Sequence, residues 1–233
     1  MKTIGLIGGM SWESSLEYYR LINEAIKAQL GGLHSAKSVM VSVDFAEIEA
    51  LQHTGRWTEA AQILIEAART LERAGAEGVV ICTNTMHKVA DEIQASVKVP
   101  LLHIADATAE RVKAAGLMRI GLLGTRFTME EDFYVGRLVL RHGLDVIVPE
   151  AAERDEVHRV IYDELCLGIT RAESKARYAA IIEQLIARGA QGIILGCTEI
   201  GLLIQQADSR VPLFDTTRLH AEAAVAWMLT GAA

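Results

Sequence analysis

The fold is decided by the stretch Gly192-Ile193-Ile194-Leu195-Gly196-Cys197-Thr198-Glu199, in which a short apolar run stops abruptly at glycine and polar side chains. Such a run is typical of a buried strand. Gly196 lets the backbone turn tightly, and Thr198 is suited to cap a helix that begins near Glu199. Cys197 then lies at the carboxyl end of a strand, where open α/β sheets bind ligands, and beside a helix N-terminus, which favours the thiolate. We take Cys197 as a candidate base or nucleophile, the alternative being a small buried hydrophobic residue.

The same alternation of strand and helix runs from the start of the chain. Residues 3–9 form a short apolar run that ends in a glycine pair, and residues 11–30 follow with helical periodicity. Further strands are predicted over residues 38–44, 78–82 and 100–104, and a further helix over residues 57–73. This alternation predicts a parallel sheet with right-handed crossovers.

Part of this pattern repeats in the second half of the chain. After Gly116, the stretch Ile120-Gly121-Leu122-Leu123-Gly124 closely repeats Ile4-Gly5-Leu6-Ile7-Gly8. Residues 75–83 correspond in the same way to residues 189–197, and residues 99–101 to residues 211–213. Three matches in one order, with almost constant spacing, favour an internal duplication.

The duplication predicts an α/β fold of two pseudo-symmetric parallel-sheet lobes, with the active site in the cleft between them. We expect an N-terminal lobe over residues 1–115 and a C-terminal lobe over residues 116–216, with a last helix, 217–233, packing back on the first lobe. The repeat gives Thr83 the position that Cys197 has in the second lobe. Equivalent strand ends would then meet across one cleft.

Composition narrows the class of protein. The 233 residues are 51% hydrophobic, which suffices for one large domain or two small ones. A net charge of -7 without a Lys/Arg-rich block argues against nucleic acid or a membrane as partner, and no run is long enough to span a bilayer. Three cysteines without CxxC spacing, and no visible signal peptide, indicate reduced thiols in the cytoplasm. The histidines are scattered, so we expect no metal site.

A second polar stretch follows the third strand of the first lobe. It reads Thr83-Asn84-Thr85-Met86-His87 and corresponds in position to the residues after Gly196. Small hydroxyl and amide side chains with free N–H groups at a helix start suit a carboxylate ligand. Plain capping of the helix by Asn84 or Thr85 is the alternative.

Together these stretches resemble the cofactor-independent aspartate/glutamate racemase family, in particular its aspartate racemase branch. The resemblance covers nearly the whole chain through GLIGGMSWESS at 5–15, CTNTMHK at 82–88, ELCLG at 164–168 and LGCTEIGLL at 195–203. It implies two α/β lobes, a pair of acid-base residues on opposite faces of the substrate Cα, and no cofactor.

The resemblance also assigns residues to the site. It implies that Cys197 is the second catalytic residue of the pair and that Met10 and Gln52 line the pocket. The α-carboxylate of the substrate would be held by three further side chains, those of Asn84, Thr85 and Thr198.

Two positions depart from the family pattern. Thr83 stands where the first catalytic cysteine is usual, and Cys82 is one residue out of register, so that it faces the core. Cys166 stands where aspartate racemases tend to carry lysine, and the acid Glu164 is close to it in sequence. A lysine at position 166 would pair with an acidic substrate side chain, so its absence leaves room for neutral or basic amino acids as substrates. An ordinary exposed helix charge is an equally good interpretation of Glu164.

These observations predict a racemase that interconverts L- and D-amino acids, aspartate and glutamate or a broader range, by proton transfer at Cα between Cys197 and Thr83. No pyridoxal phosphate or other cofactor is expected, the partner is a small amino-acid substrate, and the assembly is a cytoplasmic homodimer. One alternative is an isomerase or decarboxylase of the same fold that uses a single cysteine. The other is a two-lobed amino-acid-binding protein without turnover.

Overall fold

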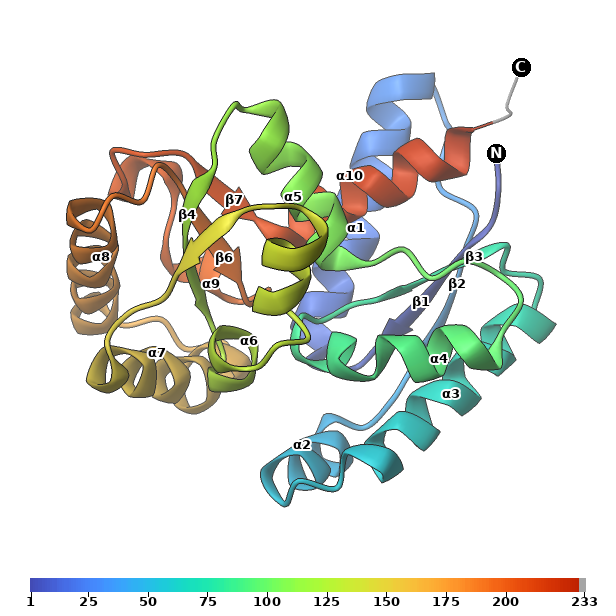
Figure 1. Ribbon diagram of the computed structural model, residues 1–233. Coiled ribbons are helices and arrows are strands. Elements are labelled where there is room, and N and C mark those ends of the chain that lie inside the picture. Colours follow the sequence, from blue (N-terminus) through green and yellow to red (C-terminus); the bar gives the residue numbers. More distant parts are fainter. Residues whose placement is uncertain (231–233) are drawn as a thin grey trace. The chain divides into compact units, whose positions relative to one another are not determined.

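The computed structural model describes residues 1–230 and divides them into two compact units (Figure 1). One unit comprises residues 1–104 and the chain from His220 onward, and the other comprises residues 105–219. The division falls just after Ile104, the first residue of helix α5 (Ile104–Ala114), whereas the boundary expected from the sequence came after the helix. Asp106 of α5 is the physical reason, because its carboxylate pairs with Arg137 at 2.7 Å and His142 at 2.8 Å, both in the second unit.

The first unit is built on a three-stranded parallel sheet of order β2-β1-β3. These strands are β1 (Ile4–Gly8), β2 (Ser38–Ser42) and β3 (Gly78–Ile81). Its helices are α1 (Trp12–Leu30), α2 (Phe45–His53), α3 (Trp57–Arg73), the 3-10 helix η1 (Thr85–Val89), α4 (Ala90–Ser96) and most of α10 (Thr216–Leu229). The last three residues predicted for the C-terminal helix, 231–233, lie outside the described residues.

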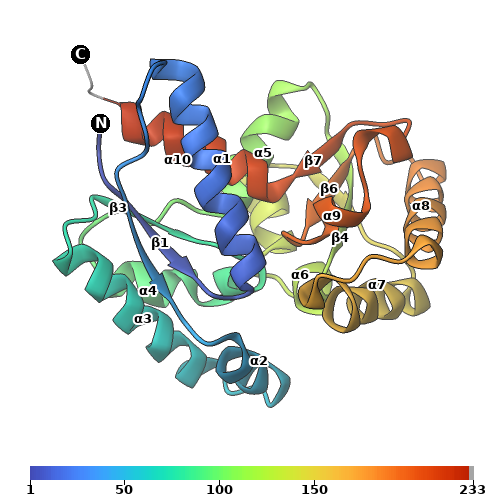
Figure 2. The same cartoon turned by 180° about the vertical axis from the view of Figure 1, so that it is seen from behind.

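Two apolar cores cover the two faces of this sheet. Leu6 and Val80 point to a core shared with α1 and α10, which lie side by side in Figures 1 and 2. Ile7 and Ile81 point to the opposite core, which the apolar faces of α3 and α4 complete. This alternation follows from the two-residue period of a strand.

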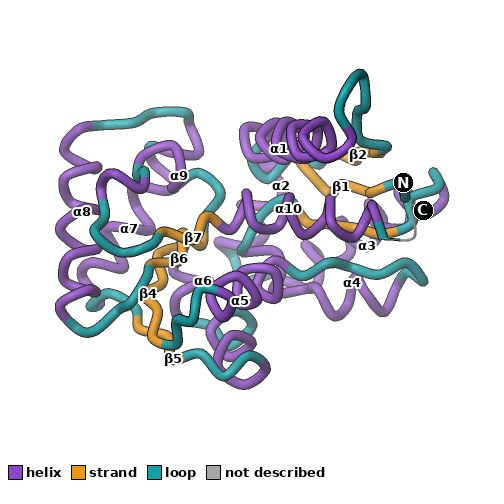
Figure 3. The backbone as a smooth tube through the Cα atoms, turned by 90° about the horizontal axis from the view of Figure 1, so that it is seen from above, coloured by secondary structure: helices purple, strands orange, loops and turns teal. Residues whose placement is uncertain are grey.

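The second unit repeats the arrangement with a four-stranded parallel sheet of order β5-β4-β6-β7 (Figure 3). Its strands are β4 (Arg119–Gly124), β5 (Asp145–Ile147), β6 (Ile193–Gly196) and β7 (Leu213–Asp215). Besides α5, it contains α6 (Arg126–Glu130), the π-helix η2 (Arg137–Arg141), α7 (Ala151–Asp163), α8 (Ala172–Ala187), α9 (Ile200–Leu203) and the 3-10 helices η3 (Leu165–Leu167) and η4 (Gln206–Asp208). The prediction of two similar parallel-sheet α/β lobes is confirmed.

The strand predicted over residues 100–104 is wrong in its extent. The structure has a single bridge there, between Val79 and Leu101. The chain then turns into α5, because the N–H of Ile104 donates to His87 Nε2 at 3.3 Å instead of to a neighbouring strand. The equivalent stretch of the second unit forms the complete strand β7. No helix in the described part of the chain is both long and apolar enough to cross a membrane.

Candidate active site

The end of β6 places Cys197 beside a carboxylate in the second unit. Gly196 lets the end of β6 pack closely against β4, since a Cβ at Gly196 would lie 2.8 Å from the carbonyl oxygen of Leu123 in β4. Cys197 is 9% exposed, and its Sγ donates a hydrogen bond to Glu199 Oε2 at 3.0 Å. Thr198 Oγ1 donates to the same oxygen at 2.6 Å. Glu199 is therefore a residue of the candidate site that sequence reasoning missed, although the acid two positions after Cys197 was a visible signal.

The environment of Cys197 opposes the thiolate. Burial raises the pKa of the Cys197 thiol well above its ordinary value, and the negative charge of Glu199 and a contribution from Cys166 raise this pKa further. The expectation that a helix start would lower the pKa of Cys197 is therefore wrong. Helix α9 is only four residues long, and it cannot offset the loss of water and a carboxylate in contact. Cys197 is held as a thiol that donates to Glu199.

The end of β3 carries the matching polar loop in the first unit. Asn84 and Thr85 are buried there, at 2% and 5% exposure, and Thr83 is half-buried. The Asn84 side chain makes no capping hydrogen bond to η1, which argues against plain capping by this residue. His87 holds the loop through two hydrogen bonds. Its Nδ1 donates to the carbonyl oxygen of Thr83 at 2.8 Å, and its Nε2 accepts the N–H of Ile104.

Cys82 points away from this loop. It is fully buried in the core shared with α1 and α10, its N–H donates to Ile7 O, and its carbonyl accepts the Ser14 hydroxyl at 2.8 Å. Burial alone raises the pKa of the Cys82 thiol far above its ordinary value. The prediction that Cys82 faces the core and cannot replace a catalytic cysteine at position 83 is confirmed.

Gln52 and Met10 lie in the same unit as the Thr83 loop. Gln52 of α2 is buried, and its Nε2 contacts Met86 Sδ at 3.0 Å, next to Thr85. Met10 is 2% exposed and belongs to the same apolar core as Met86. Gly9 precedes Met10 with φ at 95°, a backbone conformation that favours glycine. Gln52 thus lies near the loop at the end of β3, and Met10 shares an apolar core with Met86 of η1.

Glu164 belongs to the second unit and is not an exposed helix charge. It is 2% exposed, accepts a hydrogen bond from Ser174 Oγ at 2.6 Å and pairs with Arg159 at 3.2 Å. It lines a charged cavity of about 440 Å³ between α7 and α8, together with Glu156, Arg159, Arg171, Glu173, Ser174 and Arg177. Both oxygens of Glu164 are therefore engaged by the protein itself. Its predicted contact with substrate stays a prediction.

Among the described residues, 1–230, no group of three His, Cys, Asp or Glu side chains is arranged to hold a metal ion. Thr83, Asn84 and Thr85 belong to the first unit, whereas Cys197 and Glu199 belong to the second. Each polar loop follows the corresponding strand of its sheet.

Comparison with known proteins identifies the family. The profile of the Asp/Glu/Hydantoin racemases matches residues 7–224. The chain belongs to this racemase family. A crystal structure of an Asp/Glu racemase candidate from Yersinia pestis is 59% identical, with a TM-score of 0.92 over 98% of this chain and 100% of that one. An aspartate racemase homologue from Pyrococcus horikoshii is 37% identical, with a TM-score of 0.85 over 98% and 99% of the two chains.

A third relative extends the family relation to proteins of known activity. The broad specificity amino-acid racemase RacX of Bacillus subtilis is 25% identical over 174 residues, which is 73% of each chain. Family membership and the shared two-lobed fold make this protein a racemase by descent, in the isomerase class.

Proposed function

We propose that this protein racemises amino acids without pyridoxal phosphate, by moving a proton between solvent-exchangeable side chains and the substrate Cα. The observation that carries the proposal is the buried hydrogen bond from Cys197 to Glu199 at the end of β6. RacX acts on a broad range of amino acids, and the Pyrococcus relative is an aspartate racemase homologue. Aspartate, glutamate or a broader set are therefore the substrates to test.

The pair of Cys197 and Glu199 supplies the base. Cys197 passes its proton to the Glu199 carboxylate, to which it already donates a hydrogen bond, and the thiolate left behind is a strong base that suits the weakly acidic Cα–H. The cationic ammonium group of a bound amino acid favours the thiolate, because an opposite charge nearby stabilises the charged form. The Cys197 thiolate then takes the Cα proton, and the electron pair moves into the substrate carboxylate to form an enediolate-like anion.

Donors around that carboxylate lower the barrier. We assign the side chains of Asn84 and Thr85 to it, since one well-placed donor in a closed site contributes roughly 3–4 kcal/mol. The hydroxyl of Thr198, predicted as a third donor, is already engaged with Glu199 Oε2 at 2.6 Å. Thr83 is assigned to the opposite face of Cα. Its hydroxyl can give a proton to Cα only while it takes another from water, because it has no accessible anionic form near neutral pH. Thr83 is therefore a proton relay and a poor base.

The assay that tests this function is the loss of the Cα proton in D₂O, followed by NMR for both enantiomers of the common amino acids. Racemisation gives exchange together with appearance of the other enantiomer. A binding protein gives neither, and a decarboxylase releases carbon dioxide.

Because Cys197 is the better base, deuterium should enter one enantiomer faster than that enantiomer inverts. Thr83→Cys should remove this difference between the rate of exchange and the rate of inversion. Equal wash-in to both enantiomers of the natural protein contradicts the role given to Thr83.

Replacing Glu199 with glutamine is expected to make Cys197 reactive at lower pH. The Glu199 carboxylate raises the pKa of Cys197 through its charge and its side-chain hydrogen bond, so a neutral amide should lower that pKa. The measurement is the rate of alkylation of Cys197 by iodoacetamide against pH, read by peptide mass spectrometry in a Cys166→Ser background. The midpoint should move down relative to the same background with Glu199 intact. An unchanged or higher midpoint would show that Glu199 does not raise the pKa of Cys197.

We also propose a cytoplasmic homodimer. Trp12, Leu16 and Tyr19 share one face of α1 and are 64%, 58% and 51% exposed, and such apolar faces commonly mark protein contacts. The three cysteines are free thiols, which is typical of a reducing compartment. Sedimentation velocity should give twice the 25.4 kDa mass of the chain, and Leu16→Glu should lower it to one chain. A monomeric mass for the natural protein contradicts the proposed homodimer. Cell fractionation tests the cytoplasmic location.

A further inference from the structure

The hydroxyl of Thr217 is buried and unsatisfied. Thr217 lies in the first turn of α10 and is 1% exposed, and within residues 1–230 its Oγ1 has no hydrogen-bond partner. The adjacent Thr216 differs, because its hydroxyl donates to the carbonyl oxygen of Leu195 at 2.8 Å. Buried polar atoms in folded proteins are nearly always paired, so an orphaned one calls for a partner from outside the fold.

Strand register places Thr217 and Cys197 at the same edge of the sheet. Strands β6 and β7 are parallel neighbours, and their last paired residues are Leu195 and Asp215. Cys197 and Thr217 each lie two residues further along the chain, at the same carboxyl edge of the sheet. The carboxyl edge of a parallel sheet is where such folds bind ligands.

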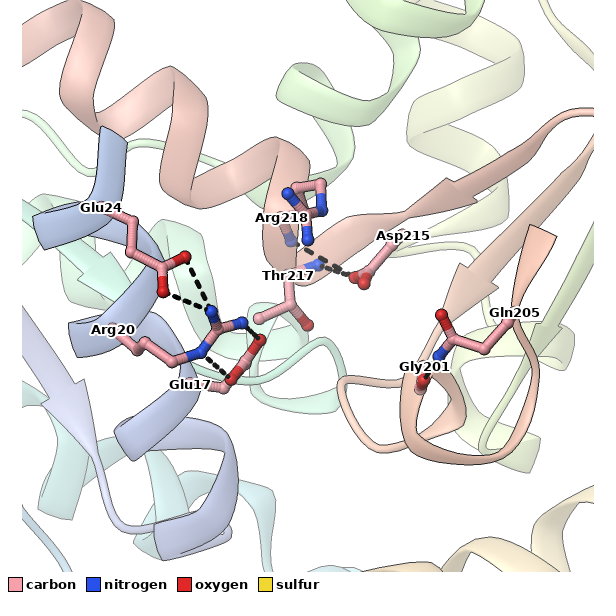
Figure 4. Close-up of polar contacts among 8 residues, drawn as sticks. All are labelled: Glu17, Arg20, Glu24, Gly201, Gln205, Asp215, Thr217 and Arg218. Atoms are coloured by element: carbon pink, nitrogen blue, oxygen red, sulfur yellow. Dashed lines mark hydrogen bonds and ion pairs between the residues drawn. The ribbon is translucent and has the colours of Figure 1, made fainter. Parts of the chain in front are cut away.

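The backbone around Thr217 is fixed by Asp215. The N–H groups of Thr217 and Arg218 both donate to Asp215 Oδ1, at 2.9 Å and 3.3 Å. Figure 4 shows these two bonds, in which the Thr217 hydroxyl takes no part. Two N–H groups in the first turn of α10 are thereby occupied, whereas the Thr217 hydroxyl in the same turn has no partner within residues 1–230.

This edge of the second unit is rich in acceptor oxygens. Glu199 is 3% exposed and accepts a hydrogen bond from Cys197, and Asp215 is the last residue of β7. A Cβ at Gly201 would lie 3.1 Å from Asp215 Oδ2, so α9 packs closely against this carboxylate. An α-carboxylate would be repelled from such an edge. An ammonium group, which has three donors and no acceptor, suits it.

We propose that Thr217 Oγ1 accepts a hydrogen bond from the α-ammonium group of the amino acid bound beside Cys197. The proposal rests on the proposed function, and it adds a binding residue that fixes which end of the substrate faces this edge. A cation held there also favours the Cys197 thiolate that the reaction needs.

The test compares Thr217→Val, which removes only the hydroxyl, with Thr217→Ser, which keeps it. Binding of L-aspartate and of succinate, which lacks the amino group, is measured by calorimetry; if the exchange screen favours L-alanine, propionate is its partner. Thr217→Val should weaken binding of the amino acid about ten- to hundredfold, the range for a hydrogen bond to a charged group, and change binding of the deaminated acid by less than about twofold. Thr217→Ser should keep both affinities.

A second readout separates binding from structure. Since the hydroxyl is unsatisfied, Thr217→Val should leave the melting temperature unchanged or raise it by a few degrees. A lower melting temperature, or equal losses for the amino acid and the deaminated acid, overturns the proposal, as does an unchanged affinity for the amino acid or a natural protein that binds none. If the natural protein binds amino acids but never exchanges the Cα proton, the racemase function fails while these affinities still decide the role of Thr217.

Discussion

Changing Cys197 to serine is expected to lower Cα exchange by about 10²- to 10⁴-fold, the usual contribution of a general acid-base residue. A serine hydroxyl is slightly smaller than the thiol and can still donate to Glu199, but it has no anionic form that the substrate could induce near neutral pH. The measurement is the rate of Cα–H loss in D₂O per folded molecule, with the folded fraction taken from circular dichroism.

Cys82→Ser is the matched control for this result. Cys82 is also a buried cysteine directly after a strand, β3, but it faces the apolar core shared with α1 and α10. A hydroxyl there should cost about 1–3 kcal/mol of unfolding free energy while exchange per folded molecule stays within about twofold. Similar losses of exchange in both variants, or rapid exchange by Cys197→Ser, would show that Cys197 is not the acid-base residue.

Replacing Gly9 with alanine is expected to destabilise the first unit by roughly 2–4 kcal/mol, the sum of a positive φ for a residue with a Cβ and an overpacked contact. Gly9 has φ at 95°, and a Cβ there would lie 2.1 Å from the carbonyl oxygen of Val43 and 2.6 Å from its nitrogen. Both are backbone atoms, and Val43 N–H is held by Gly8 O at 3.0 Å, so neither can move aside easily. Urea unfolding measures the loss.

Gly31→Ala provides the comparison for Gly9. Gly31 ends α1 with φ at 73°, but a Cβ there would meet no atom within 4 Å. It should therefore cost only the conformational part, about 1 kcal/mol. Equal losses at the two positions would mean that the contact with Val43 relaxes at little cost and that the loop before Met10 is not rigidly held.

The sequence by itself determined the elements and their duplication. Helix α3 runs over the predicted residues Trp57–Arg73, and β6 stops at Gly196 as the quoted stretch predicts. The inward direction of Cys82 also followed from the sequence. These features depend on side-chain periodicity and on glycine, which act between residues close together in the chain.

Tertiary structure alone decided the chemistry of the polar groups. The strand expected over 100–104 is cut short by a hydrogen bond from Ile104 to His87. The buried carboxylate of Glu164 is paired with Arg159 of α7 and Ser174 of α8. The thiol of Cys197 is held protonated by burial and by the way Glu199 folds back on it. Such outcomes depend on which groups the fold packs around an atom and how much water it removes, and linear spacing does not encode either.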